Sequence, residues 1–452
     1  MSLPQPPKTR VLLLSEGAHP DWVSVALEGW SQAQALARVA DVHLVTQVRN
    51  RDPILQAGLI EGVDFTAIDT EALARPIGLI GQKLRGGDNK GHTLLTALSS
   101  VIYPYFETLV WRQFGPRIEA GEFDVVHRHL PLTPTAPSPI AGRCRRAGVP
   151  FVLGPLNGGL PWPGPFKGLL RREKEWLSYV RSGYKLLPGF HSTRRHASAI
   201  IAGSGDVLDQ MPPRYLEKCV YIPENGVDPA RFARKRTRQA GRPLRGVFIG
   251  RLVPYKGADM LLEAAAPLIR AGDFRLDVIG DGPQMPELRA IVAREGIEAG
   301  VTLHGWVQHE KVADHFAEAD VLASPSVREF GGAVVLEAMA VGLVPIVVAY
   351  GGPGELATDR TGYLLPMEAR PALIARLRSL LEAIAADPAQ IEPKSRAAIR
   401  RVDRHFTWDA KARQILEVYD WALGRRPTKP DFPVPIPDDP VEAIEPAALP
   451  AV

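Results

Sequence analysis

The residues best suited to chemistry lie between positions 325 and 340, where a short apolar run gives way to a helical pattern. The stretch is Pro325-Ser326-Val327-Arg328-Glu329-Phe330-Gly331-Gly332-Ala333-Val334-Val335-Leu336-Glu337-Ala338-Met339-Ala340. The glycine pair permits close backbone approach, and the helix start that follows offers free N–H groups that suit a phosphate. Glu329 precedes this start, and Glu337 lies more than one turn into the helix. Because carboxylates accept hydrogen bonds from vicinal hydroxyls, we expect the two to reach a bound sugar nucleotide from two sides.

A second group of charges follows another apolar run, at Gly250-Arg251-Leu252-Val253-Pro254-Tyr255-Lys256-Gly257. The segment lies between a predicted strand and a predicted helix. Arg251 and Lys256 are therefore expected at the carboxyl end of a parallel sheet, where ligands bind in open α/β folds. Two cations there would neutralise a diphosphate and stabilise it as it departs. An ordinary pair of solvated surface charges is the alternative.

The first half of the chain offers weaker candidates. His127 and His129 alternate at the end of a predicted strand and share one face, so each could be a catalytic or a structural histidine. We prefer His129 because it lies beyond the predicted strand end. Gly17, after the first predicted strand, could form a donor-phosphate loop or a simple turn, and Gly29 competes with it.

Short apolar strands alternate with amphipathic helices almost throughout, which is typical of parallel α/β sheets. Strands are predicted at 10–15, 42–46, 125–127, 151–154, 199–202, 220–223, 245–249, 275–279, 301–305, 321–324 and 344–348. Helices are predicted at 30–39, 258–271, 285–295, 309–319, 332–341 and 406–423. The pattern predicts two Rossmann-like units.

Length and composition limit the function classes. A chain of 452 residues suits two domains, and a formal charge of +4 is too small to indicate a nucleic-acid partner. Two cysteines cannot build a zinc site, and neither a secretory signal nor a clean membrane-spanning run is visible. We therefore expect a cytoplasmic protein. Residues 425–452 contain eight prolines and are predicted to be a disordered tail.

Together these motifs resemble the glycosyltransferases of family 4, which have the two-domain GT-B fold. The resemblance rests on the Glu329–Glu337 pair with the apolar run after it, and on four further motifs in the order that the family has them. These are Gly250-Arg251-Leu252 with Lys256-Gly257, Ile279-Gly280-Asp281-Gly282-Pro283, Pro223-Glu224-Asn225-Gly226-Val227-Asp228 and Gly351-Gly352-Pro353. The likeness is strong over residues 223–355 and looser in the first half.

The resemblance implies a fold and a division of the chain. Two Rossmann-like domains would face a cleft, and a C-terminal helix would pack back on the first domain. The acceptor-side domain would span 1–227, the nucleotide-sugar domain 228–402, the crossover helix 403–424 and the tail 425–452.

It also implies an activity and a role for each residue. The reaction would be retaining transfer of a hexose from a nucleoside diphosphate sugar to an acceptor hydroxyl, with no metal and no other cofactor. Glu337 would bind the ribose, Glu329 the transferred sugar with the amides of 331–334 nearby, and Arg251 and Lys256 the diphosphate. His129 would face the transferred sugar and the acceptor. The donor-binding set is Arg251, Lys256, Gly331, Gly332, Ala333, Val334, Glu337 and Gly17.

Three alternatives remain open at the level of sequence. A nucleotide-sugar epimerase could use the same fold, and a scaffold that binds nucleotide sugars without turnover is a second possibility. The third concerns residues 165–196, where basic and aromatic residues interleave. This segment is either an ordinary helix with a solvated face or a surface that meets anionic lipid at the inner face of the membrane and suits a lipid-linked acceptor.

Overall fold

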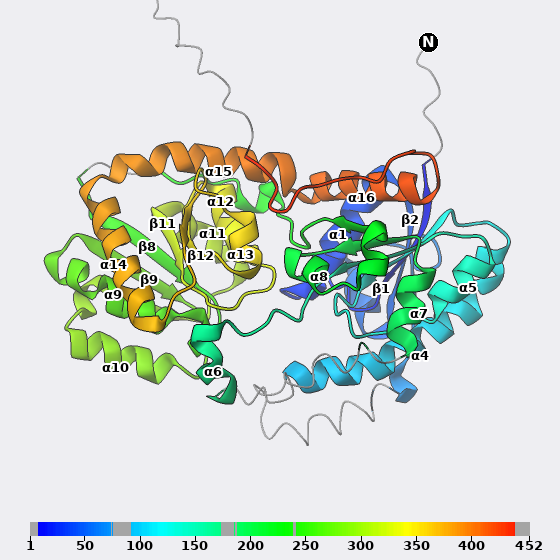
Figure 1. The fold of residues 1–452 in the computed structure, drawn as a ribbon, viewed down its shortest axis with the longest axis horizontal. Coiled ribbons are helices and arrows are strands. Elements are labelled where there is room, and N and C mark those ends of the chain that lie inside the picture. The colour runs from blue at the N-terminus through cyan, green and yellow to red at the C-terminus, as the bar shows by residue number, and fades with distance from the viewer. Residues whose placement is uncertain are drawn as a thin grey trace, which may run out of the picture.

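The computed structural model describes residues 8–73, 75, 92–172, 185, 188–237 and 241–438 of the chain. Within these ranges the protein consists of two α/β domains that lie side by side (Figure 1). Each has one parallel sheet with helices on both faces. Many of the strands, such as Phe151–Leu156 and Val344–Val348, are buried along their whole length, which explains why they appear in the sequence as continuous apolar runs.

The first domain contains a sheet of seven described strands in the order β3-β2-β1-β4-β5-β6-β7. The strands are β1 (Arg10–Ser15), β2 (Asp41–Gln47), β3 (Phe65–Ile68), β4 (Val125–Leu130), β5 (Phe151–Leu156), β6 (Ala199–Ala202) and β7 (Cys219–Tyr221). The helices are α1 (Val25–Val39), α2 (Arg51–Gln56), α4 (His92–Glu119), α5 (Ile140–Arg146), α6 (Lys167–Arg172), α7 (Pro188–His196) and α8 (Gly205–Asp209).

The second domain contains a sheet of six described strands in the order β10-β9-β8-β11-β12-β13. The strands are β8 (Leu244–Ile249), β9 (Phe274–Ile279), β10 (Val301–Gly305), β11 (Val321–Ser324), β12 (Val344–Val348) and β13 (Tyr363–Leu365). The helices are α9 (Ala258–Ala271), α10 (Met285–Glu295), α11 (His309–Glu318), α12 (Ala333–Val341), α13 (Gly351–Leu356), α14 (Arg370–Ala386) and α15 (Ile391–His405).

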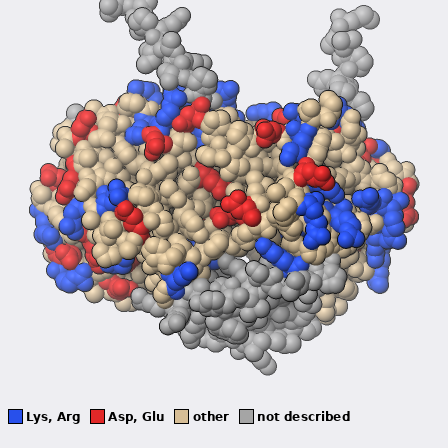
Figure 2. Space-filling model, in the orientation of Figure 1, with Lys and Arg blue, Asp and Glu red and all other residues tan. Residues whose placement is uncertain are grey.

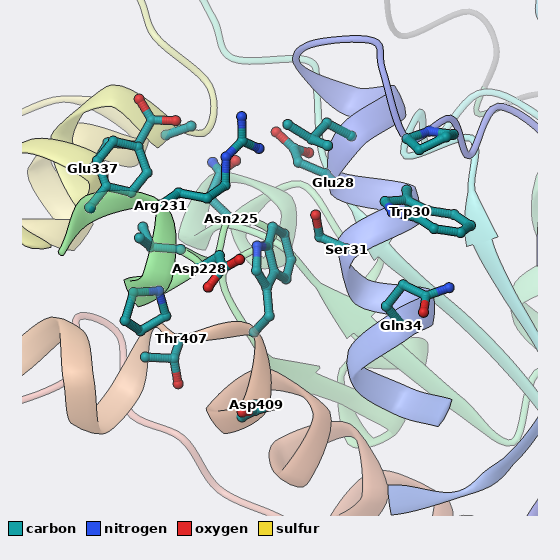
Figure 3. A pocket seen from close by; sticks show the side chains of 18 of the residues that line it. Glu28, Trp30, Ser31, Gln34, Asn225, Asp228, Arg231, Glu337, Thr407 and Asp409 are labelled. Atoms are coloured by element: carbon teal, nitrogen blue, oxygen red, sulfur yellow. The ribbon is translucent and has the colours of Figure 1, made fainter. Parts of the chain in front are cut away.

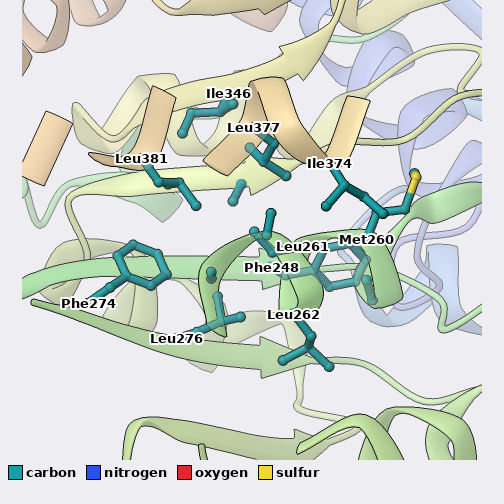
Figure 4. Packing of buried hydrophobic residues seen from close by; sticks show 14 of the residues in the cluster. Phe248, Met260, Leu261, Leu262, Phe274, Leu276, Ile346, Ile374, Leu377 and Leu381 are labelled. Atoms are coloured by element: carbon teal, nitrogen blue, oxygen red, sulfur yellow. The ribbon is translucent and has the colours of Figure 1, made fainter. Parts of the chain in front are cut away.

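The core of the second domain shows how sequence periodicity becomes packing. Leu261 of α9 and Leu377 and Leu381 of α14 meet Phe248 and Ile346 of the sheet (Figure 4). All five side chains are buried. Both sheets follow the doubly wound order, in which the chain turns back between β1 and β4 and between β8 and β11. A ligand is expected at the carboxyl ends of those strands.

The last helix, α16 (Trp408–Ala422), returns to the first domain and lies along α1 (Figure 1). It starts at Thr407, whose hydroxyl accepts a hydrogen bond from the Ala410 N–H at 3.1 Å. The chain is pinned where it crosses: Val227 N–H donates to Phe406 O at 2.8 Å, and Trp408 N–H donates to Val227 O at 3.2 Å. The predicted GT-B architecture, including the returning helix, is confirmed.

The predicted disordered tail is wrong for residues 425–438, the part of it that the structure describes. Ile436 is buried in the second domain's hydrophobic core. Arg401 donates to the backbone oxygens of Ile436 and Pro437 at 2.7 and 3.2 Å. A proline-rich strap loses little backbone entropy when it docks, and one buried isoleucine with charge-assisted hydrogen bonds holds it.

Several elements went unrecognised or were too short in the sequence prediction. The helix α1 begins at Val25 rather than at residue 30, and the unpredicted helices are α2, α4, α5, α6, α7, α8, α13, α14 and α15. The strands β3 and β13 have only four and three residues, too few for a clear period. The strand β4 continues to Leu130 instead of ending at residue 127. No helix within the described ranges combines the length and the apolar character that a bilayer crossing requires.

Candidate functional site

Two loops meet at the carboxyl ends of β8 and β11, the point where the second sheet reverses its strand order. Val327 N–H donates to Tyr255 O at 2.9 Å, and Ser326 Oγ donates to the same oxygen at 3.2 Å. A Cβ on Gly257 would lie 2.7 Å from Pro325 O, so only glycine allows this approach. The loops 250–257 and 325–332, both singled out from sequence, are therefore one structural unit.

The pair Lys256 and Glu329 forms an ion pair across this unit. Both side chains keep partial access to solvent, at 19% and 22% exposed. Burial lowers the pKa of Lys256 to about 8. Arg251 is half-buried at the start of the same loop. Lys256, which was predicted to bind the diphosphate, thus lies beside Glu329, which was predicted to bind the sugar.

The glycine pair has a local structural reason as well as a proposed chemical one. Gly332 adopts the left-handed conformation with φ +75° and caps the start of α12, so Ala333 and Val334 are its first two helical residues. A Cβ on Gly331 would come within 2.2 Å of polar side-chain atoms of Asn225 and Glu224. The loop therefore needs glycine at 332 for its left-handed conformation and at 331 to fit against the segment that joins the domains.

Glu337 lines a cavity of about 740 Å³ between the two domains (Figure 3). The opposite wall belongs to α1, and the floor is formed by residues 225–232 and the start of α16. Glu28 of α1 faces Glu337 across the cavity, and Arg231 extends between them. Of the predicted donor residues, Ala333 and Glu337 line this cavity.

Sequence reasoning missed the two first-domain acceptors around this cavity. Burial, followed by the negative charge of Glu337, raises the pKa of Glu28 to about 7. Glu28 Oε2 and Asn225 Oδ1 are buried and have no hydrogen-bond partner among the described residues. Asn225 belongs to one of the motifs named from sequence, whereas Glu28 precedes the predicted helix 30–39 and nothing in the sequence distinguishes it.

His129 lies inside β4 rather than in a loop, because the strand continues past it to Leu130. It is 2% exposed and does not line the cavity between the domains. Burial lowers its pKa to about 3, and the neighbouring His127 adds to the effect, so the ring is neutral. Its Nδ1 atom is buried and has no hydrogen-bond partner among the described residues.

His127 has the structural role that was left open for both histidines. Its Nδ1 lies 2.6 Å from the Tyr419 hydroxyl of α16, and its Nε2 lies 2.6 Å from Gly154 O. The ring therefore ties β4 to β5 and to the returning helix. This histidine is fully occupied by the fold.

The two first-domain glycines differ in what they permit. A Cβ on Gly17 would meet only Leu130 Cδ1, at an ordinary 3.8 Å. A Cβ on Gly29 would lie 2.5 Å from that same atom and 2.9 Å from Ser15 Oγ. Gly29 therefore allows α1 to pack closely on the sheet, and Gly17 lies in the loop after β1 with no steric requirement for glycine.

The basic segment 165–196 is only partly described, and the side chains of Arg171, Arg172 and Lys174 lie outside the described residues. Arg194 is buried and donates to Phe190 O and Pro134 O, each at 3.1 Å, so it supports the fold. Basic side chains gather on the face over α5 and α7 (Figure 2). A groove of about 600 Å³ there is lined by Pro139, Gly142, Arg143, Arg145, Arg146, Ser192 and His196.

The described residues contain no candidate metal site. No three His, Cys, Asp or Glu side chains there are grouped to hold a metal ion. Cys144 and Cys219 are both buried and unpaired, and burial raises the pKa of the Cys219 thiol to about 11.

Comparison with known structures agrees with the architecture derived above: two parallel sheets and a returning helix define a GT-B protein. Sucrose-phosphate synthase from Thermosynechococcus elongatus aligns with a TM-score of 0.61 at 18% identity, over 93% of this chain and 100% of that one. HepE of Anabaena, in complex with UDP and glucose, gives 0.59 at 17%, over 91% and 100%. At such identities these likenesses establish the fold.

Sequence comparison points to a family through the second domain. Residues 243–383 match the family model of the group 1 glycosyl transferases. The D-inositol 3-phosphate glycosyltransferase of Kineococcus radiotolerans is 34% identical over 46% of this chain and 53% of its own length. The putative colanic acid biosynthesis glycosyltransferase WcaL of Escherichia coli is 28% identical over 43% and 50%. The chain thus spans about half the length of the curated relatives it matches.

Proposed function

We propose that the protein is a retaining, metal-independent glycosyltransferase of family 4 that moves a hexose from a nucleoside diphosphate sugar to an acceptor hydroxyl. The observation that carries this proposal is the Lys256–Glu329 pair at the reversal point of the second sheet, beside the start of α12. A cation, a carboxylate and free helix N–H groups within one loop unit suit a ligand that combines a diphosphate with hydroxyls.

In this proposal each residue keeps the role expected from sequence. Lys256 and Arg251 bind the diphosphate and stabilise its charge as the sugar leaves. Glu329 accepts hydrogen bonds from the transferred hexose, and Glu337 accepts them from the ribose. Gly17 and the backbone of residues 331–334 complete the donor contacts. His129 keeps its expected role toward the transferred sugar and the acceptor, although in the structure it is buried within β4. Because two cations act on the diphosphate, no divalent ion is needed for that step.

The names of the relatives favour a role in cell-surface polysaccharide or glycolipid synthesis. WcaL is named for colanic acid biosynthesis, and HepE was solved with UDP and glucose. A sugar nucleotide as donor and a carbohydrate or lipid-linked acceptor fit this setting. A cytoplasmic location, where nucleotide sugars are available, completes the proposal.

A thermal-shift panel of nucleoside diphosphates and their sugars tests the donor class directly. The true donor should raise the melting temperature by mass action, and the shift should survive a chelator. Binding restored only by Mg²⁺ or Mn²⁺ would contradict the metal-free mechanism. Incubation with the donor alone separates the enzyme classes, because a transferase gives slow hydrolysis whereas an epimerase gives a new sugar nucleotide.

We also propose that the basic face of the first domain meets an anionic membrane when the acceptor is lipid-linked. The groove lined by Arg143, Arg145 and Arg146 supports this, since its lining includes no acidic residue. Each basic residue near an anionic leaflet contributes about 1 kcal/mol, so neutralising all three should weaken vesicle binding roughly a hundredfold. If the unaltered protein does not sediment with phosphatidylserine vesicles at low salt, the membrane proposal fails.

A further inference from the structure

One segment of the first domain leaves its own sheet and contacts the second domain. After β5 the chain runs through residues 160–166, here named the bridging segment, and into α6, which lies beside the second domain (Figure 1). Phe166 is buried in the second domain's core, and Leu169 packs against that core. The chain therefore passes between the domains here as well as at residues 227 and 407, where Val227 and Thr407 pair.

The bridging segment contacts both loops of the candidate donor site. Leu160 O accepts a hydrogen bond from Arg328 Nε at 3.1 Å. The Trp162 ring lies 4.7 Å from the Arg328 guanidinium carbon and meets Tyr255 edge-on, with 6.0 Å between ring centroids. Arg328 directly precedes Glu329, and Tyr255 directly precedes Lys256. The contacts therefore fall on the neighbours of the two charged residues.

The local sequence explains why this segment can serve as a rigid support. Pro161, Pro163 and Pro165 alternate with Trp162 and Gly164. Each proline fixes its own φ and favours an extended residue before it, so the segment has few alternative conformations. Pro161 O also accepts a hydrogen bond from the Tyr350 hydroxyl at 2.8 Å, which anchors it to the loop before α13.

Arg328 connects the bridging segment to the candidate donor site, because it contacts the segment and directly precedes Glu329. Its guanidinium lies over two aromatic rings, 4.7 Å from the centroid of Trp162 and 5.0 Å from that of Phe330. The side chain is buried, and cation–π contacts strengthen when the cation is desolvated. A fixed Arg328 on one side and Phe330 on the other restrict the backbone of Glu329 between them.

We propose that the bridging segment positions Glu329 for the transferred sugar, with Trp162 and Arg328 as positioning residues. The inference rests on the proposed function, because it assigns Glu329 to the sugar of the donor. It adds that recognition of the sugar by the second domain depends on a first-domain tryptophan. The nucleoside diphosphate part is held by Lys256, Arg251 and Glu337. It should depend on the bridging segment much less, because the segment makes its hydrogen bond and its cation–π contact with Arg328, whereas Tyr255 beside Lys256 receives an edge-on ring contact.

Calorimetry on the full chain tests this through the difference between two probes. The probes are the nucleotide sugar that the thermal-shift panel selects and the matching nucleoside diphosphate. Trp162→Ala should weaken binding of the nucleotide sugar about tenfold and change that of the diphosphate less than twofold. Trp162→Phe keeps a ring over Arg328 and should restore most of the loss.

A double-mutant cycle and a matched control separate positioning from general loosening. Arg328→Lys keeps the charge but loses the planar stack and the Nε bond, so it should match Trp162→Ala. The double variant should be no weaker than either single variant, because both remove the same support. Trp421→Ala, in the half-buried surface of α16, should leave both affinities unchanged.

The outcomes distinguish this inference from the proposed function. Equal loss of both probes, no loss of either, or additive single variants would overturn the positioning role while leaving a glycosyltransferase intact. If the unaltered protein binds no nucleotide sugar in the panel, the proposed function fails, and the positioning role fails with it.

Discussion

The two reversal points of the molecule share a topology and differ in what fills them. In the first domain, the strand after the reversal, β4, carries Arg128, whose guanidinium donates to Pro131 O, Thr133 O, Ala136 O and Ser138 Oγ. Beside it His127 is bonded at both ring nitrogens. In the second domain, the loop after β11 carries Glu329, which pairs with Lys256 and stays partly exposed.

This contrast shows that strand order predicts where a ligand site can form. It does not predict whether the protein's own side chains fill that place. At the first reversal point, the terminal nitrogens of Arg128 and both ring nitrogens of His127 are satisfied by the protein and contribute to stability, whereas His129 Nδ1 has no partner among the described residues. The charged groups at the second are satisfied by one another, so a ligand can replace the partner. We therefore expect substitutions at the first point to change stability and those at the second to change turnover.

The largest expected effect is at the second reversal point. Lys256→Ala should lower kcat at saturating donor by about a hundredfold, or about 3 kcal/mol in activation free energy, because charge develops on the diphosphate as the sugar leaves. Arg251→Ala should act in the same direction. Steady-state kinetics with the donor that the panel selects measures both.

The matched control is Lys235→Ala, since Lys235 donates to Ala340 O near the far end of α12. It should keep kcat within about twofold, as expected for a charge away from the reacting atoms. Full kcat in Lys256→Ala under donor saturation would remove this lysine from the leaving-group role.

Most of the strands could be predicted, and so could the helices α1, α9, α10, α11, α12 and α16, because their signals are local and periodic. The helices α9 and α10 begin and end at the predicted residues, each closed by a left-handed glycine, Gly272 and Gly296. The short strands β3 and β13 are defined by their neighbours, and the docked strap at 425–438 depends on a distant arginine, Arg401. Tertiary partners of this kind leave no period in the sequence.

The candidate site divides in the same way. The loops 250–257 and 325–332 follow strands and were visible as motifs. Glu28 could not be found from sequence, because its burial and the nearby Glu337 carboxylate of α12, which raise its pKa, arise only in the fold. Trp162 could not be found because its contact with Arg328 joins residues that are 166 positions apart. A single sequence holds no information on which distant residues meet.

At the first reversal point the expected effect is on stability. His127→Ala should lower the free energy of unfolding by about 2–3 kcal/mol, because it leaves the Tyr419 hydroxyl and Gly154 O without their partner in a buried site. Chemical denaturation at pH 7 measures the loss. His129→Ala should cost less, since its Nδ1 has no partner to lose within the described chain.

The histidines also predict a pH dependence with a defined sign. Burial lowers the pKa of His127 to about 4, below the value near 6.5 of an unfolded histidine. The unfolded chain therefore takes up the proton first, and the wild type should lose stability as pH falls from about 6.5 to 4. His127→Ala should lose less over that range, and parallel curves would contradict the assignment.

The cavity between the domains should show a smaller effect, on affinity. Glu337→Ala should weaken binding of the nucleoside diphosphate about tenfold, because ribose hydroxyls lose their acceptor. Calorimetry at pH 7 measures this, with Glu382→Ala on the exposed face of α14 as the control. Unchanged affinity in Glu337→Ala would move the ribose elsewhere in the cleft.

The smallest effect concerns Glu355 of α13, which joins the two regions. Its carboxylate accepts hydrogen bonds from Gly205 N–H at 2.9 Å and from the Tyr221 hydroxyl at 2.9 Å, both in the first domain. Burial raises its pKa to about 7, although these hydrogen bonds oppose the shift; Asp206 and Asp209 raise it further. Acidic side chains gather on this face where the domains meet (Figure 2).

A raised carboxyl pKa makes the folded state bind a proton that the unfolded chain has already released. The contribution of Glu355 to stability should therefore fall as pH rises from about 4.5 to 7 and stay level above that. Glu355→Gln keeps an acceptor for the two donors but cannot ionise, so its stability relative to the wild type should increase by about 1–2 kcal/mol between pH 5 and 8. Denaturation at several pH values measures this difference, and Glu382→Gln should give a curve parallel to the wild type. If the curve of stability against pH for Glu355→Gln is also parallel to that of the wild type, the contact between the domains is insensitive to the charge of Glu355. The difference between the two domains is then confined to the loops at their reversal points.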